Sequence, residues 1–205
     1  MEKRNWKRSV TLKQRMVLCL AAFFAAFALQ LALNGYQARA VQQVQDDQMG
    51  NFNAISRFQG GVESSISILE AYRWENGETE EMLEKLRAAC STSNAWLWRI
   101  RSNMDGLQNV SDEQWVLYGA VETTYGSYNT LLEELESYLS SGQEAKASQL
   151  YYNKVSVCGG YLSQYTMQLL KASILDAQTT YTEISELGER IALMQIVVVA
   201  LCVAL

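Results

Sequence analysis

Apolar residues recur along the first half of the chain at alternating intervals of three and four, which is the period of an amphipathic helix. Between residues 34 and 74 they form a heptad pattern with two seams. One seam holds Val41, Gln48, Ile55, Val62 and Leu69, and the other holds Val44, Asn51, Phe58, Ser65 and Tyr72. The two seams predict one long helix with a buried stripe. The pair Asn76-Gly77 is a turn signal that ends it.

The same spacing predicts a second helix after this turn. Thr79 is a suitable N-cap, and glutamates follow it in the first turn, where the helix dipole favours them. The predicted buried stripe is Leu83, Leu86, Cys90, Ser93, Leu97, Ile100 and Met104. The loop 105–111 then ends this helix.

Two capping boxes predict where a third and a fourth helix begin. Ser111 precedes Gln114 by three residues, and Ser141 precedes Glu144 by three. The third stripe is predicted to be Leu117, Val121, Thr124, Tyr128, Leu131, Leu135 and Tyr138. The fourth is predicted to be Leu150, Val155, Cys158, Leu162, Tyr165, Leu169, Ala172, Leu175, Tyr181, Ile184 and Leu187. The chain has no proline, so no strong helix breaker interrupts any of these segments.

Two predominantly apolar runs lie outside the amphipathic pattern, at residues 16–33, where Gln30 is the only strongly polar residue, and at residues 191–205. Their length and composition lead us to expect two transmembrane helices. The second run continues to the last residue and suggests a span that is cut short, with a short tail anchor as the alternative. Gly188 lies just before it, as a hinge or as a tolerated glycine.

These elements together predict an all-α fold. Two transmembrane helices flank an antiparallel four-helix bundle, residues 34–190, whose first and fourth helices are the longest. Short connections make successive helices antiparallel. Residues of the first and fourth helices that face each other should then have numbers that sum to about 225.

Charge gives the expected topology. The net charge is −5, yet residues 1–15 are basic, with Glu2 as their single acidic residue. The positive-inside rule therefore predicts a multi-pass protein of the cell membrane, with a cytoplasmic basic tail (1–15) and an extracytoplasmic domain (34–190) in contact with a lipid bilayer. The acidic remainder argues against nucleic acid as a partner.

The absence of histidine excludes histidine-based acid–base catalysis and histidine-ligated metal sites. No triad, Cys–His dyad or phosphoacceptor histidine can form within the chain. Neither a catalytic residue, a metal site nor a cofactor is predicted. The two cysteines outside the apolar runs, Cys90 and Cys158, are expected to be buried free thiols, with one disulfide as the alternative.

This pattern of a basic tail, an apolar run, four helices and a second apolar run resembles the sensor region of bacterial transmembrane receptors. The opening segment Ser9–Phe27 is similar in style to the start of such receptors. The resemblance implies the input region of a sensor histidine kinase of a two-component system, or of a chemoreceptor. It also implies a homodimer and signal transduction by displacement of the last helix. A helical membrane-anchored interaction protein, not an enzyme, is the alternative class.

Aromatic and basic residues predict where a ligand would bind. If numbers that sum to about 225 face each other, Arg57 lies near Lys171. The remaining members of this predicted ligand site are Trp96, Trp98, Arg99 and Trp115. Indoles and guanidinium groups suit a small anion or an aromatic compound. A partner protein is the alternative signal, and ordinary packing of tryptophans at the end of a bundle is the alternative to any site.

Overall fold

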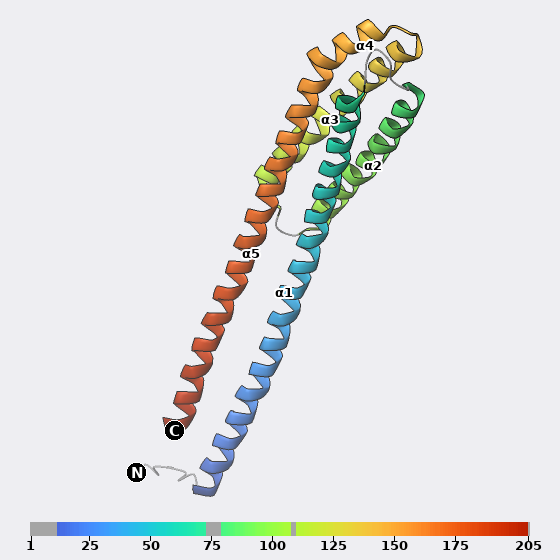
Figure 1. Ribbon diagram of the computed structural model, residues 1–205. Helices are drawn as coiled ribbons and strands as arrows, with labels where there is room; N and C mark the ends of the chain where they lie inside the picture. The colour runs from blue at the N-terminus through green and yellow to red at the C-terminus, as the bar shows by residue number, and fades with distance from the viewer. Residues whose placement is uncertain (1–11, 73–78, 108–109, 205) are drawn as a thin grey trace, which may run out of the picture. The chain divides into compact units, whose positions relative to one another are not determined.

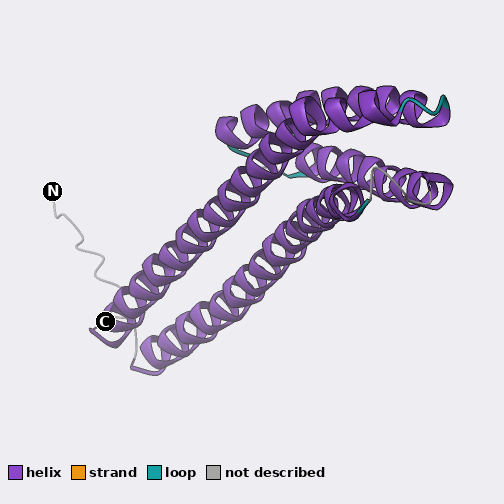
Figure 2. Cartoon of the chain, turned by 45° about the horizontal axis from the view of Figure 1, so that its top comes forward, coloured by secondary structure: helices purple, strands orange, loops and turns teal. Residues whose placement is uncertain are grey.

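The computed structural model describes residues 12–72, 79–107 and 110–204 of the chain, and helices make up nearly all of them (Figure 2). They are α1 (Leu12–Ala71), α2 (Thr79–Gly106), α3 (Asp112–Ser140), α4 (Glu144–Leu150), the π-helical turn η1 (Tyr151–Val155) and α5 (Ser156–Ala204). Because α4, η1 and α5 follow one another without a break, the described residues form four helical rods, and the all-α prediction is confirmed. The turn at Asn76-Gly77 and the tail up to residue 11 lie outside the described residues.

The chain divides into two compact units. The helix-pair unit, residues 1–43 and 181–205, holds the N-terminal part of α1 and the C-terminal part of α5. The bundle unit, residues 44–180, holds the rest of α1 and α5 together with α2, α3, α4 and η1 (Figure 1). The two units share two helices but differ in how many helices surround each side chain.

The bundle unit has a single apolar core to which every one of its helices contributes. Ile55, Phe58, Ile100, Val121 and Leu162 are completely buried. The stripes predicted for α1 and α2 are confirmed within this unit: in α1 every predicted position from Asn51 onward is buried, and in α2 all but the half-buried Cys90. Heptad spacing was sufficient here because each helix has one apolar face and no competing one.

Helix α3 buries a neighbouring stripe instead of the predicted one. Val121, Tyr128 and Leu135 are buried as predicted. The four other predicted positions are only partly buried, and the residue one position later in the chain is buried in each case: Tyr118, Tyr125, Leu132 and Leu139. Two overlapping stripes with the same period exist in α3, so periodicity could not separate them. The Tyr125 ring packs edge-on against Phe58, with ring centroids 5.3 Å apart, and its hydroxyl donates to the Cys90 carbonyl at 2.8 Å.

The two predicted capping boxes have different outcomes. Ser111 is the N-cap of α3, and its hydroxyl accepts from the Gln114 backbone N–H at 3.3 Å, so this start is confirmed. Ser141 does not begin the next helix. It caps the end of α3 with its hydroxyl on the Ser137 carbonyl, and α4 has Gln143 as its N-cap. Gly142 between them has φ +69, a left-handed conformation that glycine adopts without steric cost.

Helices α1 and α2 pack closely at Gly61. A Cβ atom at this position would overlap the Ser93 hydroxyl, whereas one at the neighbouring Gly60 would meet nothing within 4 Å. The hydrogen atom on Gly61 therefore permits the α1–α2 crossing, and α1 continues through both glycines as helix. Ser93 is itself buried and donates to the Ala89 carbonyl at 3.0 Å.

The membrane prediction is wrong. Across the described ranges 12–72, 79–107 and 110–204, no helix has an apolar stretch of the length and hydropathy needed to cross a bilayer. A span needs about 20 consecutive, mostly apolar residues. The run 16–33 contains Gln30, and the shorter run 191–205 contains Gln195. The two transmembrane helices and the multi-pass membrane localisation with an extracytoplasmic domain are corrected accordingly.

Candidate functional site

The seam between α1 and α5 in the helix-pair unit is the first candidate site. Half-buried residues on α1 recur at Ala26, Gln30, Leu33 and Gln37, and on α5 at Ile184, Gly188, Ile191 and Gln195. Intervals of three and four place each set on one face of its helix. Among the described residues of this unit no side chain is fully buried. The seam is therefore a single line of contact between two helices and encloses no core.

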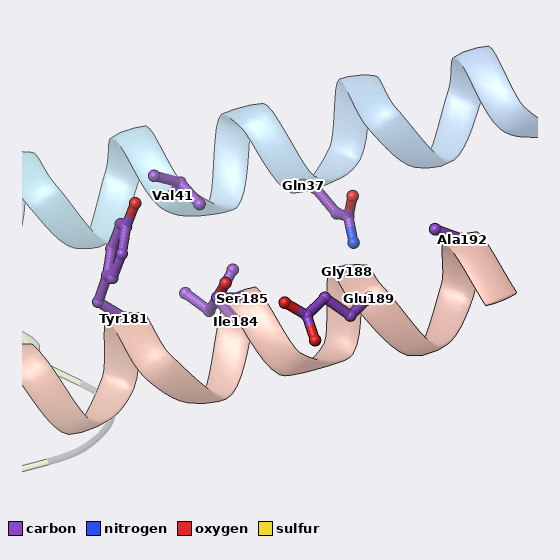
Figure 3. Close-up of a pocket in the computed structure, with 8 residues that line it drawn as sticks. All are labelled: Gln37, Val41, Tyr181, Ile184, Ser185, Gly188, Glu189 and Ala192. Atoms are coloured by element: carbon purple, nitrogen blue, oxygen red, sulfur yellow. The ribbon is translucent and has the colours of Figure 1, made fainter.

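A cavity of about 390 Å³ opens along this seam (Figure 3). Its apolar wall is formed by Val41 and Ile184, and Tyr181 lies at one end. The remaining lining residues are Gln37, Ser185, Gly188, Glu189 and Ala192. The space is an open groove and not an enclosed void, so along it the two helices are not in close side-chain contact.

Gln37 and Gly188 meet across the cavity. A Cβ atom at Gly188 would lie 3.1 Å from Gln37 Nε2, so the glycine leaves room for the amide. Gln37 Nε2 is buried and has no hydrogen-bond partner in the described part of the chain, and the same holds for Gln195 Nε2. A buried donor without a partner costs roughly 1–3 kcal/mol. In the observed register of α1 and α5, the seam therefore contains two buried amide donors without a partner among the described residues, one from Gln37 on α1 and one from Gln195 on α5.

In both units, residues of α1 and α5 that face each other have numbers that sum to about 225, as the sequence analysis predicted. Gln37 and Gly188 have numbers that sum to 225, and in the bundle unit the Asn51 side chain donates to Ser173 Oγ at 3.4 Å. Asn51 is completely buried, and its Oδ1 atom has no partner among the described residues. A polar contact therefore also interrupts the α1–α5 contact inside the bundle unit.

The residues of the predicted ligand site come from α1, α2, α3 and α5. The Arg57 guanidinium lies over the Trp96 ring, 5.2 Å from its centroid, and Nε donates to Asn53 Oδ1 at 3.0 Å. Trp98 is 68% exposed. Trp115 stands edge-on to Tyr118, with ring centroids 6.2 Å apart. Lys171 is exposed on α5.

Arg99 lines a groove to which no tryptophan of the described residues contributes. This groove of about 280 Å³ lies in the bundle unit, and Asp46, Asp47, Ser102 and Asn103 also line it. The structure therefore brings Arg57 and Trp96 together as a cation–π pair and places Arg99 in a groove of mixed charge.

Both cysteines of the bundle unit are unpaired and half-buried. Burial raises the pKa of the Cys90 thiol to about 11 and raises that of Cys158 as well. The Cys158 thiol donates to the Thr124 carbonyl at 3.7 Å. Thiols in this state are poor nucleophiles, because the thiolate is the reactive form.

Sequence reasoning missed the cavity although a signal for it existed. The seam predicted for α1 began at Val41, and continuing it toward the N-terminus by four, four and three residues leads to Gln37, Leu33 and Gln30. Gln37 was overlooked because the segment before Val41 was interpreted as an exit from a membrane. Gly188 was noted as a hinge or a tolerated glycine, without the partner that explains it.

Comparisons with known proteins supply no relative. No protein-family model, no curated protein and no solved structure matches the chain. The fold and the geometry of the two units are therefore the basis for any functional proposal.

Proposed function

We propose that the chain is a non-enzymatic sensor module that passes a signal as a displacement of α5 relative to α1. The observation that carries the proposal is the seam of the helix-pair unit, which combines a cavity of about 390 Å³ with the unpaired amides of Gln37 and Gln195. A tightly packed apolar seam would resist sliding, whereas a loose polar seam has little contact energy to lose.

A specific second register supports this mechanism. Ser185 lies one turn before Gly188 and lines the same cavity. A shift of α5 by three residues, slightly less than one helical turn and about 4.5 Å along its axis, would place the Gln37 amide opposite the Ser185 hydroxyl. The unpaired donor would then gain an acceptor, while the close fit of Gln37 against Gly188 would be lost. Two registers of similar energy are what a signal needs, since a ligand can shift only an equilibrium that exists.

The resemblance described in the sequence analysis supplies the class of receptor. The input region of a bacterial sensor histidine kinase is preferred, and that of a chemoreceptor comes second. Both rely on relative movement of the first and last helices of a bundle. The lack of histidine in the chain agrees with a role in input, because phosphotransfer then requires a residue outside it.

Distance measurements in the helix-pair unit test the proposal. Spin labels attached to Arg39→Cys and Glu183→Cys, both exposed, would report axial movement of α5 in a chain whose native cysteines are replaced by serine. We expect a broad or two-peaked distance distribution. Gly188→Leu should fill the cavity and Gln37→Leu should remove the polar contact, so each should narrow the distribution to one peak.

Arg190→Gln is the matched control, because Arg190 is exposed and lies outside the cavity lining. It should leave the distribution unchanged. One narrow peak in the parent chain, unaltered by Gly188→Leu and Gln37→Leu, would mean that α5 does not move and would rule out the relay.

A second function is favoured by the exposed apolar side chains of the helix-pair unit. Phe23, Phe24 and Phe27 are 53%, 64% and 52% exposed, and Leu193 and Met194 are 63% and 65% exposed. Apolar surface of this extent marks a site of association. The occupant that we propose is a second copy of the chain, which agrees with the expected homodimer. Light scattering should give a molecular mass twice that of one chain. The double variant Phe24→Glu with Phe27→Glu should reduce this mass to that of a single chain.

A further inference from the structure

A groove of about 280 Å³ lies between α1 and the last turns of α2, within the bundle unit. Its α1 wall carries Asp46, Asp47 and Gly50. Its α2 wall carries Arg99, Ser102 and Asn103. Charges of both signs thus line one small concavity, on two different helices.

The charged side chains that line the groove do not form ion pairs with one another. Arg87 and Arg101, on the same helix as Arg99, form ion pairs with Glu136 and Glu122 of α3. In the described part of the chain no ion pair or hydrogen bond joins Arg99 to Asp46 or Asp47. A guanidinium and two carboxylates that share a groove without pairing remain available to a ligand that carries complementary charges.

The end of α2 adds to the negative character of one side. Gly106, its last residue, lines the groove, and the last turn of α2 contains no basic residue. The carbonyls of Asn103 and Met104 both accept from the Leu107 N–H, at 3.1 and 3.3 Å. The C-terminus of a helix carries about half a negative charge and attracts cations. With the two aspartates it forms a region that favours an ammonium group, while Arg99, about two turns earlier on α2, favours a carboxylate.

We propose that this groove binds a small zwitterion, a compound with a primary ammonium group at one end and a carboxylate at the other, joined by a short chain. The ammonium group faces Asp46 and Asp47, and the carboxylate accepts hydrogen bonds from Arg99. A singly charged compound would satisfy one side and leave the other unmatched. As the signal of a sensor this ligand rests on the proposed function, whereas its binding does not.

The size of the groove limits the ligand. Pockets for drug-sized compounds begin at about 300 Å³, so the groove takes a smaller molecule of a few carbon atoms. Gly50 lies in its wall, and a Cβ atom there would meet nothing within 4 Å. Gly50→Leu should therefore fold normally while its side chain occupies ligand space.

Calorimetric titration of the full chain with δ-aminovalerate tests the site. Valerate and pentylamine, which each lack one of the two charges, are the matched compounds. We expect δ-aminovalerate to bind at least about 10-fold more tightly than either. Arg99→Gln, the double variant Asp46→Asn with Asp47→Asn, and Gly50→Leu should each weaken binding by about 10-fold or more.

Arg101→Gln is the control variant, because Arg101 is exposed on the same helix and does not line the groove. It should bind δ-aminovalerate as the parent chain does. No binding of δ-aminovalerate, equal binding of a singly charged analogue, or unchanged binding by Arg99→Gln would each overturn the proposal. Circular dichroism of each variant separates loss of the site from loss of the fold.

Failure of this site and failure of the proposed function are distinguishable. The spin-label distances of the helix-pair unit report the movement of α5 without any ligand. A mobile seam with no binding of δ-aminovalerate would remove the zwitterion site and leave the relay. Binding with a single fixed distance distribution would remove the relay and leave the site.

Discussion

The bundle unit and the helix-pair unit are built from the same two long helices, yet only the bundle unit has a core. In the bundle unit, side chains such as Ile55 and Leu169 are completely buried. In the helix-pair unit, the described residues reach at most half-burial, and residues as apolar as Phe24 are more than half exposed. The period of apolar residues predicts which face of a helix turns inward, but the number of neighbouring helices decides how much is buried.

The largest difference between the units should appear when an aromatic side chain is removed from each. Phe58→Ala removes a completely buried ring that packs against Tyr125, and it should lower the free energy of unfolding by about 3–5 kcal/mol. Phe27→Ala, at a position 52% exposed, should change it by about 0.5 kcal/mol or less. Urea unfolding followed by circular dichroism measures both, and comparable losses would contradict the contrast between the units.

Glycine substitutions should separate a close helix crossing from an open one. Gly61→Ala brings a methyl group against Ser93 and should lower the free energy of unfolding by about 1–3 kcal/mol. Gly60→Ala meets open space and should raise it by about 0.5–1 kcal/mol, because alanine is the better helix former.

Ser93→Gly in the Gly61→Ala background should restore part of the loss, since it removes the overlapping hydroxyl. In the helix-pair unit, Gly188→Ala meets only the end of the Gln37 side chain, which can turn away. It should therefore resemble Gly60→Ala. A penalty at Gly188 as large as that at Gly61 would show that the seam of the helix-pair unit is tightly packed.

A single buried hydroxyl should have a smaller effect. Ser65 donates to the Val62 carbonyl at 2.7 Å, so the Tyr128 hydroxyl, 3.0 Å from Ser65 Oγ, is the donor between the two. Tyr128→Phe should cost about 1 kcal/mol. Tyr181→Phe, at a position 63% exposed in the helix-pair unit, should be neutral in the same urea titration.

The mildest effect is expected from alkaline pH. Burial raises the pKa of Cys90 from 9.0 to about 11 and that of Tyr125 from 10.0 to about 12. The unfolded chain releases these protons first, so the corresponding stability is complete below pH 9 and is lost progressively up to about pH 12. Unfolding titrations from pH 8 to 11 should show this decline, and Cys90→Ala should make it shallower. A slope that Cys90→Ala leaves unchanged would exclude the thiol as a contributor.

Sequence patterns predicted the fold where one signal acted alone. The heptads of α1 and α2 and the cap at Ser111 are local features for which the sequence offers one outcome. The structure confirms the cap, the α1 stripe from Asn51 onward and the α2 stripe except for the half-buried Cys90. Patterns failed where two outcomes had equal local support. The two stripes of α3 have the same period, and the contacts of Tyr125 with Phe58 and Cys90 determine which one is buried.

The candidate sites were less accessible to sequence reasoning. Gln37 and Gly188 are far apart in the chain and meet only because α1 and α5 are antiparallel. Their numbers sum to 225, so the expected sum for facing residues could have identified the pair. Asp46 and Asp47 were overlooked because the search for a ligand site followed indoles and cations. Opposite charges that remain unpaired in a shared groove are a property of three-dimensional arrangement, and no spacing in the sequence reports it.

The π-helical turn η1 explains how α4 and α5 bury the same side of one rod. Leu150 and Val155 are both buried, although five residues in a regular α-helix turn through about 500° and would leave them about 140° apart. The wider turn accommodates one residue more than an α-helical turn and brings the two faces back into line. In evolutionary terms, η1 has the form of a one-codon insertion whose effect on the rest of the helix was cancelled within a single turn. A lineage that deleted one codon here would convert the turn to α-helix and keep every core contact of α5, so the length of this rod can change by single residues while its buried face is inherited intact.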